Sequence, residues 1–187
     1  MILFYVIIKK KYIKKMVFIM KNKKLLFMQI VLLIIYLSML AFFMYECFKT
    51  GEEASKQAAG VANVVADVQS AITQKPVVVD NNYKVLVSKL VGHYAYFCIL
   101  GLVSILFYMT FKRLKPIFRI ILHFGIGFIF ALITEFVAEA ITKGRNASIV
   151  DVFIDFGGLA TISMIYIIIY YILRYKNNKK EIIKNDN

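Results

Sequence analysis

Four long apolar runs divide the chain, and polar or basic residues bound each of them. A helix needs about 20 consecutive apolar residues to cross the hydrocarbon core of a bilayer. Each run reaches that length and carries little charge in its middle. The pattern therefore predicts an all-α polytopic membrane protein with four transmembrane helices. The predicted spans cover about residues 25–48, 90–111, 117–140 and 152–173.

The loop that follows the first span, residues 49–88, has a helical pattern of its own. Apolar residues recur every three or four positions from Ala54 to Ile72. Glu52 and Glu53 precede them, where the helix dipole favours acidic residues. We expect one amphipathic helix in this loop, either on the membrane surface or capping the bundle.

Basic segments flank the predicted four-span domain, residues 25–173. Residues 1–24 alternate lysines with apolar runs that are too short to span a bilayer. The segment from Met20 reads as a complete bacterial N-terminus, so residues 1–19 are interpreted as a start-site artefact. The alternative is a helix on the inner membrane surface. The polar tail, residues 174–187, is expected to be disordered.

Composition agrees with insertion in a membrane. The chain is 60% hydrophobic with a mean hydropathy of +0.70, which is too apolar for an ordinary soluble domain. A net charge of +13 could indicate nucleic-acid binding, but the lysines gather at the ends of apolar runs, where they complement anionic lipid. Membrane lipids, and no nucleic acid, are the expected partners. Cys47 and Cys98 fall in apolar stretches and are interpreted as buried thiols.

The distribution of basic residues predicts the orientation. Of the 24 Lys and Arg residues, seventeen lie in or beside the N-terminal segment, the turn between the second and third spans, and the tail. Seven lie in or beside the two remaining loops, residues 49–88 and 141–151. Cytoplasmic loops carry the excess of Lys and Arg. Both termini are therefore predicted to face the cytoplasm of a bacterial cell, with the two loops outside the plasma membrane.

Charged residues stand at membrane depth between Glu135 and Gly158. A carboxylate at that depth must be paired or protonated, and Glu135 and Asp155 each lie a turn or more inside a predicted span. At 1.5 Å per residue, His93 lies about 6 Å and Asp155 about 9 Å below the outer ends of their helices. We expect these side chains to meet in one outward-facing polar site. The other candidates for this site are Glu139, Arg145, Ser148 and Asp151.

Each candidate also has a structural interpretation. Ser148 and Asp151 fit a capping box, which we favour over a chemical role. Arg145 can reach lipid phosphate, pair with Glu139 or bind an anionic ligand, and Glu139 can simply be solvated. His93 fits a packing histidine somewhat better than a catalytic base or a ligand.

The chemistry open to this site is limited. Two carboxylates with a histidine can perform acid–base work or hold a divalent cation. We assign His93, Glu135 and Asp155 as catalytic candidates, Arg145 as the anion-binding candidate, and no metal site. Nucleotide-binding, GxSxG, HExxH and paired CxxC motifs are absent from the sequence. No cofactor or reaction follows from these residues.

Three glycines and a second histidine are interpreted as structural residues. Gly101 lies on the helix face of His93, and Gly157 and Gly158 are expected to permit close helix packing. His123 lies towards the inner side of its span, away from the polar site, so we interpret it as structural.

Two runs of residues resemble signatures of the VanZ-like family of bacterial membrane proteins. The later run, which is the more specific, matches in order and spacing at Gly144, Arg145, Ser148, Asp151, Asp155 and Gly158. The earlier run matches at His93, Tyr94, Leu100 and Gly101. The first loop resembles the family's Gly-Glu-x-Ser segment at Gly51, Glu52 and Ser55. The resemblance covers about residues 25–173.

The chain departs from the family pattern at three places. A Glu-Tyr pair is replaced by Tyr96-Phe97, a Gln by Glu139, and a Pro by Lys143. The family is named for a protein associated with low-level resistance to the glycopeptide teicoplanin, so the resemblance implies a role in the cell envelope.

Three functions remain open at this point. The first is binding or modification of an anionic envelope lipid or lipid-linked wall precursor, because an arginine beside a helix N-terminus suits a phosphate group. The second is a non-enzymatic module in which the buried charges fix helix packing or bind a partner. The third is a small transporter, which the lack of inverted-repeat symmetry and of an inward-facing polar face disfavours.

Overall fold

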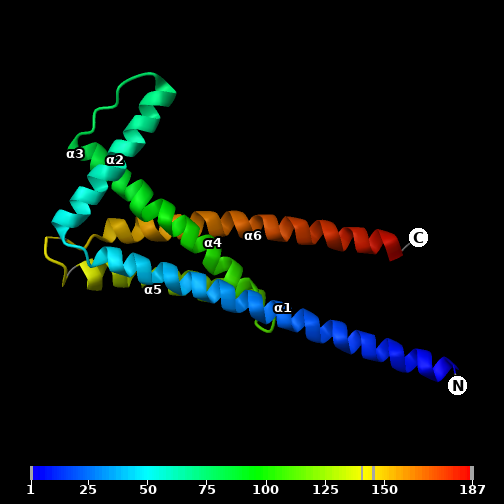
Figure 1. Cartoon of the computed structure of the whole chain (residues 1–187). Coiled ribbons are helices and arrows are strands. Elements are labelled where there is room, and N and C mark those ends of the chain that lie inside the picture. Colours follow the sequence, from blue (N-terminus) through cyan, green and yellow to red (C-terminus); the bar gives the residue numbers. More distant parts are fainter. Residues whose placement is uncertain (1, 140, 145, 186–187) are drawn as a thin grey trace.

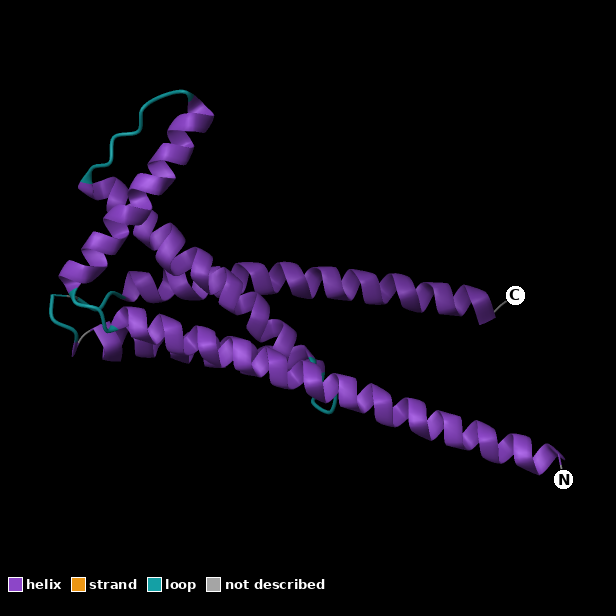
Figure 2. Ribbon diagram, viewed as in Figure 1, coloured by secondary structure: helices purple, strands orange, loops and turns teal. Residues whose placement is uncertain are grey.

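The computed structural model describes residues 2–139, 141–144 and 146–185. Side chains are described from Lys23 onward, except at 138–140, 145, 177 and 179–187. Every regular element in this part of the chain is a helix (Figure 2). Two segments, η1 and η2, are π-helical, with one more residue in each hydrogen-bonded turn than an α-helix. In order, the elements are α1 (Ile2–Cys47), α2 (Gly51–Thr73), α3 (Asn81–Val87), η1 (Ser88–Ala95), α4 (Tyr96–Met109), α5 (Pro116–Ile133), η2 (Thr134–Glu139) and α6 (Ile149–Asn185).

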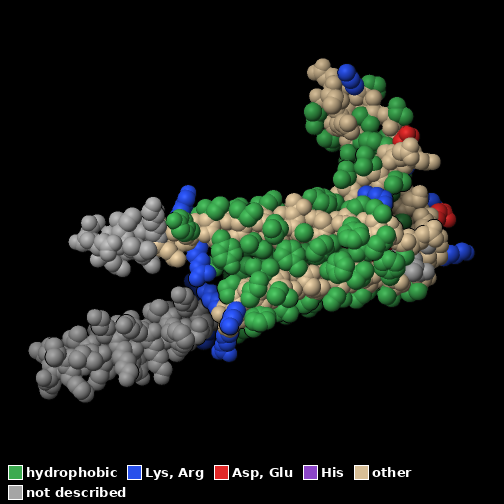
Figure 3. All heavy atoms as spheres, turned by 180° about the vertical axis from the view of Figure 1, so that it is seen from behind, with side chains coloured by type: hydrophobic (Ala, Val, Ile, Leu, Met, Phe, Trp, Pro, Cys, Tyr) green, Lys and Arg blue, Asp and Glu red, His purple; other side chains and the backbone are tan. Residues whose placement is uncertain are grey.

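Four helical stretches are long and apolar enough to cross a membrane, and large apolar side chains cover their outer surface (Figure 3). They are Lys23–Cys47, Asn81–Met109, Pro116–Val137 and Ile149–Lys176. The predicted all-α, multi-pass membrane architecture is thereby confirmed. The second stretch begins nine residues before the predicted boundary. Its first helix, α3, starts in polar sequence because the Asp80 carboxylate caps it by accepting from the backbone N–H of Tyr83 at 2.7 Å.

The amphipathic helix expected in the first loop is α2, which leans away from the bundle (Figure 1). A capping box starts it: the Thr50 hydroxyl accepts from the Glu53 N–H, and the Glu53 carboxylate accepts from the Thr50 N–H at 3.0 Å. These bonds from Thr50 hold the pKa of the exposed Glu53 carboxyl below its usual range. Val64, Val68 and Ile72 remain exposed on its far half.

The described part of the chain is helical at both ends. Helix α1 runs unbroken from Ile2 into the first span, which does not fit the alternative of a separate interfacial helix; the interpretation of residues 1–19 as a start-site artefact stays a prediction. Helix α6 continues to Asn185, where a disordered tail was expected. Lys and Glu favour the helix, and a formed helix extends at little cost per residue. Both termini lie at the same end of the molecule (Figure 1).

Helix α4 lies at the centre and contacts α1, α5 and α6. A Cβ added at Gly101 would come within 2.8 Å of the Leu159 carbonyl oxygen, so α4 and α6 are in backbone contact there. A Cβ at Gly158 would collide with the Tyr94 carbonyl oxygen, which brings α6 equally close to η1. Gly157 does not permit close helix packing as expected. A Cβ added there would meet nothing within 4 Å.

His123 is a packing residue, as the sequence indicated. Its side chain is buried, with Nδ1 2.7 Å from the Ser104 hydroxyl and Nε2 2.8 Å from the Ser163 hydroxyl. The Ser163 hydroxyl also donates to the Leu159 carbonyl at 2.6 Å, and the Ser104 hydroxyl to the Gly101 carbonyl at 3.3 Å. The His123 imidazole therefore joins α4, α5 and α6, with each ring nitrogen in hydrogen-bonding distance of a serine hydroxyl.

The contact at Gly158 generates a matched pair of stability predictions. Gly158→Ala should lower the free energy of unfolding by about 1–3 kcal/mol, because the new methyl group must displace the Tyr94 carbonyl. Gly157→Ala adds the same methyl group in open space and should be neutral or stabilising by up to about 1 kcal/mol. Unfolding of the purified protein in detergent measures both. Equal stability of the two variants would contradict the close contact.

Candidate functional site

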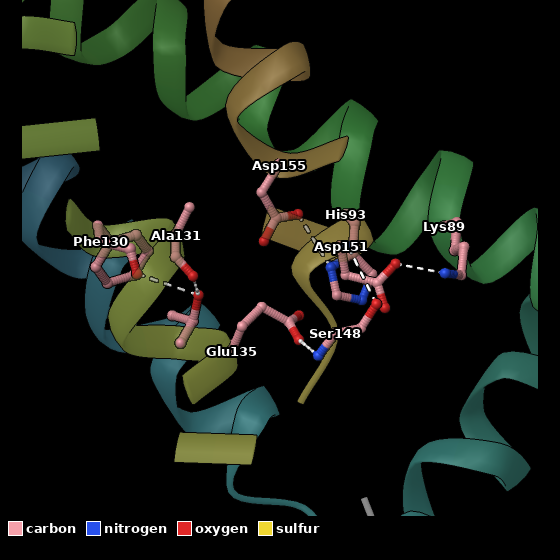
Figure 4. A network of polar contacts seen from close by, with 9 residues as sticks. Lys89, His93, Phe130, Ala131, Glu135, Ser148, Asp151 and Asp155 are labelled. Carbon is pink, nitrogen blue, oxygen red and sulfur yellow. Dashed lines mark hydrogen bonds and ion pairs between the residues drawn. The ribbon is translucent and has the colours of Figure 1, made fainter. Parts of the chain in front are cut away.

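Three predicted residues from separate helical stretches meet at the end of the bundle opposite the termini (Figure 4). His93 lies in η1, Glu135 in η2 and Asp155 in the first turns of α6. One possible ligand atom from each side chain lies within 4.8 Å of the other two. The convergence predicted from their similar depths in the membrane is therefore present in the structure.

The two carboxylates are enclosed by protein. Asp155 is 0% exposed and Glu135 is 1% exposed, so water provides neither with bulk solvation. His93 Nδ1 lies 3.0 Å from Asp155 Oδ1, in hydrogen-bonding distance. The second oxygen, Asp155 Oδ2, is buried and has no hydrogen-bond partner among the described residues. A carboxylate so placed requires a compensating charge or a proton.

Two π-helical segments position His93 and Glu135. A π-helical turn inserts one residue relative to an α-helix, which turns the following side chains by about 100° around the helix axis. Such segments are frequent at functional sites. Both of the residues that face Asp155 from neighbouring helices lie in such a segment.

The capping box predicted at the start of α6 is only half formed. The Asp151 N–H donates to the Ser148 hydroxyl at 3.4 Å, as expected for a cap. The reciprocal arm is different: the Ser148 N–H donates to Glu135 Oε2 at 3.1 Å, and the Asp151 carboxylate instead pairs with Lys89 at 2.5 Å. The buried Glu135 carboxylate occupies the donor that Asp151 would otherwise reach, and Lys89 provides Asp151 with an opposite charge.

Lys89 is the site residue that sequence reasoning missed. It lies four positions before His93, a spacing that places two helical residues on similar faces, so a signal was present. In the structure it joins η1 to the first turn of α6, beside the pair that His93 and Asp155 form.

Two hollows meet at His93. One, of about 450 Å³, has a mixed polar and apolar lining that includes Lys84, Ser88, Lys89 and Asp151. The other, of about 270 Å³, is mainly apolar and lies between α1, α2 and η1. Its lining includes Phe42, Phe43, Val61, Val91 and Tyr96. The two hollows share His93, Ser88 and small residues of α2.

A third hollow, of about 890 Å³, lies at the other end of the spans. Its basic lining residues are Lys112, Arg113, Lys115, Arg119 and Arg174. Phe97, Leu100 and Leu159 are fully buried between the two ends of the bundle.

Two predicted site residues lie outside the part of the chain that the structure describes in full. Arg145 is outside the described residues, and the Glu139 side chain is outside the described side chains. The anion-binding role of Arg145 and the solvation of Glu139 stay predictions.

Comparisons of the chain with protein-family models, with curated proteins and with solved structures found no match. The candidate site is therefore judged on its own geometry.

The contact between His93 and Asp155 predicts an energetic coupling. In a double-mutant cycle, His93→Gln and Asp155→Asn should show a coupling of about 1.5–3 kcal/mol, the range for hydrogen bonds to charged groups. Unfolding in detergent measures the four proteins. The control cycle pairs Asp155→Asn with His123→Gln, which belongs to a separate network and should be additive within about 0.5 kcal/mol. Additivity in both cycles would contradict a direct contact between His93 and Asp155.

Proposed function

We propose that the chain is a VanZ-like membrane protein of the bacterial cell envelope. In this proposal it binds or modifies an anionic envelope lipid or lipid-linked wall precursor at the site around His93. The link to teicoplanin resistance belongs to the same proposal, since it comes from the family resemblance. The observation that carries it is the junction of a lysine-lined hollow with an apolar hollow at His93.

The charges around the polar hollow favour an anion. Lys89 is already paired with Asp151, whereas the half-buried Lys84 makes no ion pair with a described residue. A phosphate group in this hollow would supply the negative charge that Lys84 lacks. A lysine near a membrane surface contributes about 1 kcal/mol to attraction of anionic lipid.

The apolar hollow suits the chain of an amphipathic ligand. Phe43 and Tyr96 stack with ring centroids 4.9 Å apart, and both line this hollow together with small residues of α2. A ligand with a phosphate head and a hydrocarbon chain can fill both hollows at once and pass His93 at their junction. A free inorganic anion would use the polar hollow alone.

The orientation proposed here places this site outside the cell and both termini in the cytoplasm. On the face that Figure 3 shows, Lys and Arg side chains gather near the terminal end of the spans, as they usually do at cytoplasmic ends of membrane proteins. The site would then face the compartment in which wall precursors are used.

The packing alternative has a specific observation in its favour. The His93–Asp155 and Lys89–Asp151 contacts both tie η1 to α6, and they would fix helix packing whether or not a ligand binds. A transporter remains the weaker alternative. The buried apolar side chains between the two ends of the bundle disfavour it.

Lipid binding is tested on the full chain in phosphatidylcholine nanodiscs, titrated with phosphatidylglycerol or a long-chain isoprenyl phosphate. Wild-type protein should prefer either anionic lipid to added phosphatidylcholine. Lys84→Gln should weaken that binding by about fivefold, which corresponds to the roughly 1 kcal/mol that one lysine contributes.

The matched control is Lys75→Gln, which removes the same charge from the exposed connection between α2 and α3. It should leave the affinity within twofold. If wild-type protein shows no preference for anionic lipid, or if both variants lose affinity equally, the binding proposal fails. The packing alternative is then favoured.

Topology is tested by cysteine labelling in intact cells. With Cys47 and Cys98 replaced by Ala, Asn146→Cys should react with a membrane-impermeant maleimide added outside, because Asn146 is exposed in the loop before α6. Lys115→Cys, in the turn between α4 and α5, should react only after the membrane is permeabilised. The reverse pattern of labelling would overturn the proposed orientation.

A further inference from the structure

The side chains of His93, Glu135 and Asp155 have the arrangement of a metal-ligand set. Their possible ligand atoms lie within 4.8 Å of one another, and they come from three helical stretches. Two ligands of a tetrahedral ion bound at about 2.0–2.1 Å are about 3.3 Å apart. His93 Nδ1 and Asp155 Oδ1 are 3.0 Å apart, so side-chain shifts of about an ångström would complete the set.

The unpartnered oxygen of Asp155 is the second, independent observation. Asp155 is 0% exposed, yet its Oδ2 accepts no hydrogen bond from any described residue. In Figure 4 the Asp155 carboxylate is directed into the space that His93 and Glu135 also face. A buried carboxylate oxygen without a donor is costly, and a cation in this space would compensate it.

The charges of the three groups balance a divalent ion. Two ionised carboxylates and a neutral imidazole sum to two negative charges, which one divalent cation neutralises. If His93 were protonated instead, these three groups would still carry one negative charge. The imidazole ligand must be neutral in any metal complex, which is consistent with this balance.

The surroundings orient the set in the way that metal ligands are usually supported. The Ser148 N–H holds one oxygen of Glu135 at 3.1 Å. Of the three residues, His93 also lines both hollows.

We propose that His93, Glu135 and Asp155 bind one divalent transition-metal ion of the Zn²⁺ or Mn²⁺ class. An imidazole favours transition ions over Mg²⁺ and Ca²⁺, and two carboxylates favour the harder members of that series. A bound ion would act as a Lewis acid towards a phosphate oxygen next to His93. The metal site does not depend on the proposed lipid binding.

The test uses the full chain in detergent, stripped with EDTA and titrated with Zn²⁺, Mn²⁺ or Mg²⁺. Wild-type protein should bind one Zn²⁺ or Mn²⁺ per chain, and Mg²⁺ should not compete at equal concentration. Asp155→Asn keeps the shape of the side chain and removes its charge, so affinity should fall by at least about 100-fold, the upper range seen even for supporting residues.

Asp67→Asn is the matched control, because it removes the same charge from an exposed position on α2 and does not line either hollow at His93. It should bind the ion within threefold of wild type. The proposal is overturned if wild-type protein binds less than one equivalent, if Asp155→Asn binds as well as wild type, or if both variants lose affinity equally. If Asp155→Asn fails to fold, the wild-type protein is tested alone. One bound Zn²⁺ per chain, with an unfolding temperature that rises with Zn²⁺ but not with Mg²⁺, supports the proposal. The absence of either result overturns it. Neither readout uses a lipid, so this test can fail while anionic lipid binding holds.

Discussion

The cost of burying the Asp155 carboxylate is the constraint on which the rest of this structure depends. The residue lies within a membrane-spanning stretch and is shielded from solvent. Such a group is tolerated only with a compensating partner. His93 provides that partner from a neighbouring helix, so the first turns of α6 and segment η1 must stay together.

Close backbone packing and the polar contacts support each other at this point. The absence of a side chain at Gly158 allows α6 to touch η1 at Tyr94, one residue after His93. On the other side, the Glu135 carboxylate accepts from the first backbone donor before α6. The site therefore consists of helix ends held by side chains, and loss of either Gly158 or the His93–Asp155 contact would loosen both.

Much of this arrangement could be read from the sequence, because membrane insertion imposes few and strong rules. Run length gave the spans, and a 1.5 Å rise per residue placed His93, Glu135 and Asp155 at one depth. The spacing of Lys89 and His93 indicates a shared helix face, but the partner of Lys89, Asp151, cannot be predicted in this way. That pairing depends on the direction of side chains around each helix axis, and the π-helical segment η1 shifts that direction with no clear signature in residue type.

The most direct test of the central claim uses the fact that the chain has only two histidines. Imidazole nitrogen NMR of histidine-labelled protein should give one signal set for His93 and one for His123. Asp155→Asn should shift the His93 nitrogens and leave those of His123 unchanged, because only His93 contacts Asp155. Unchanged His93 signals would contradict the contact on which the site rests.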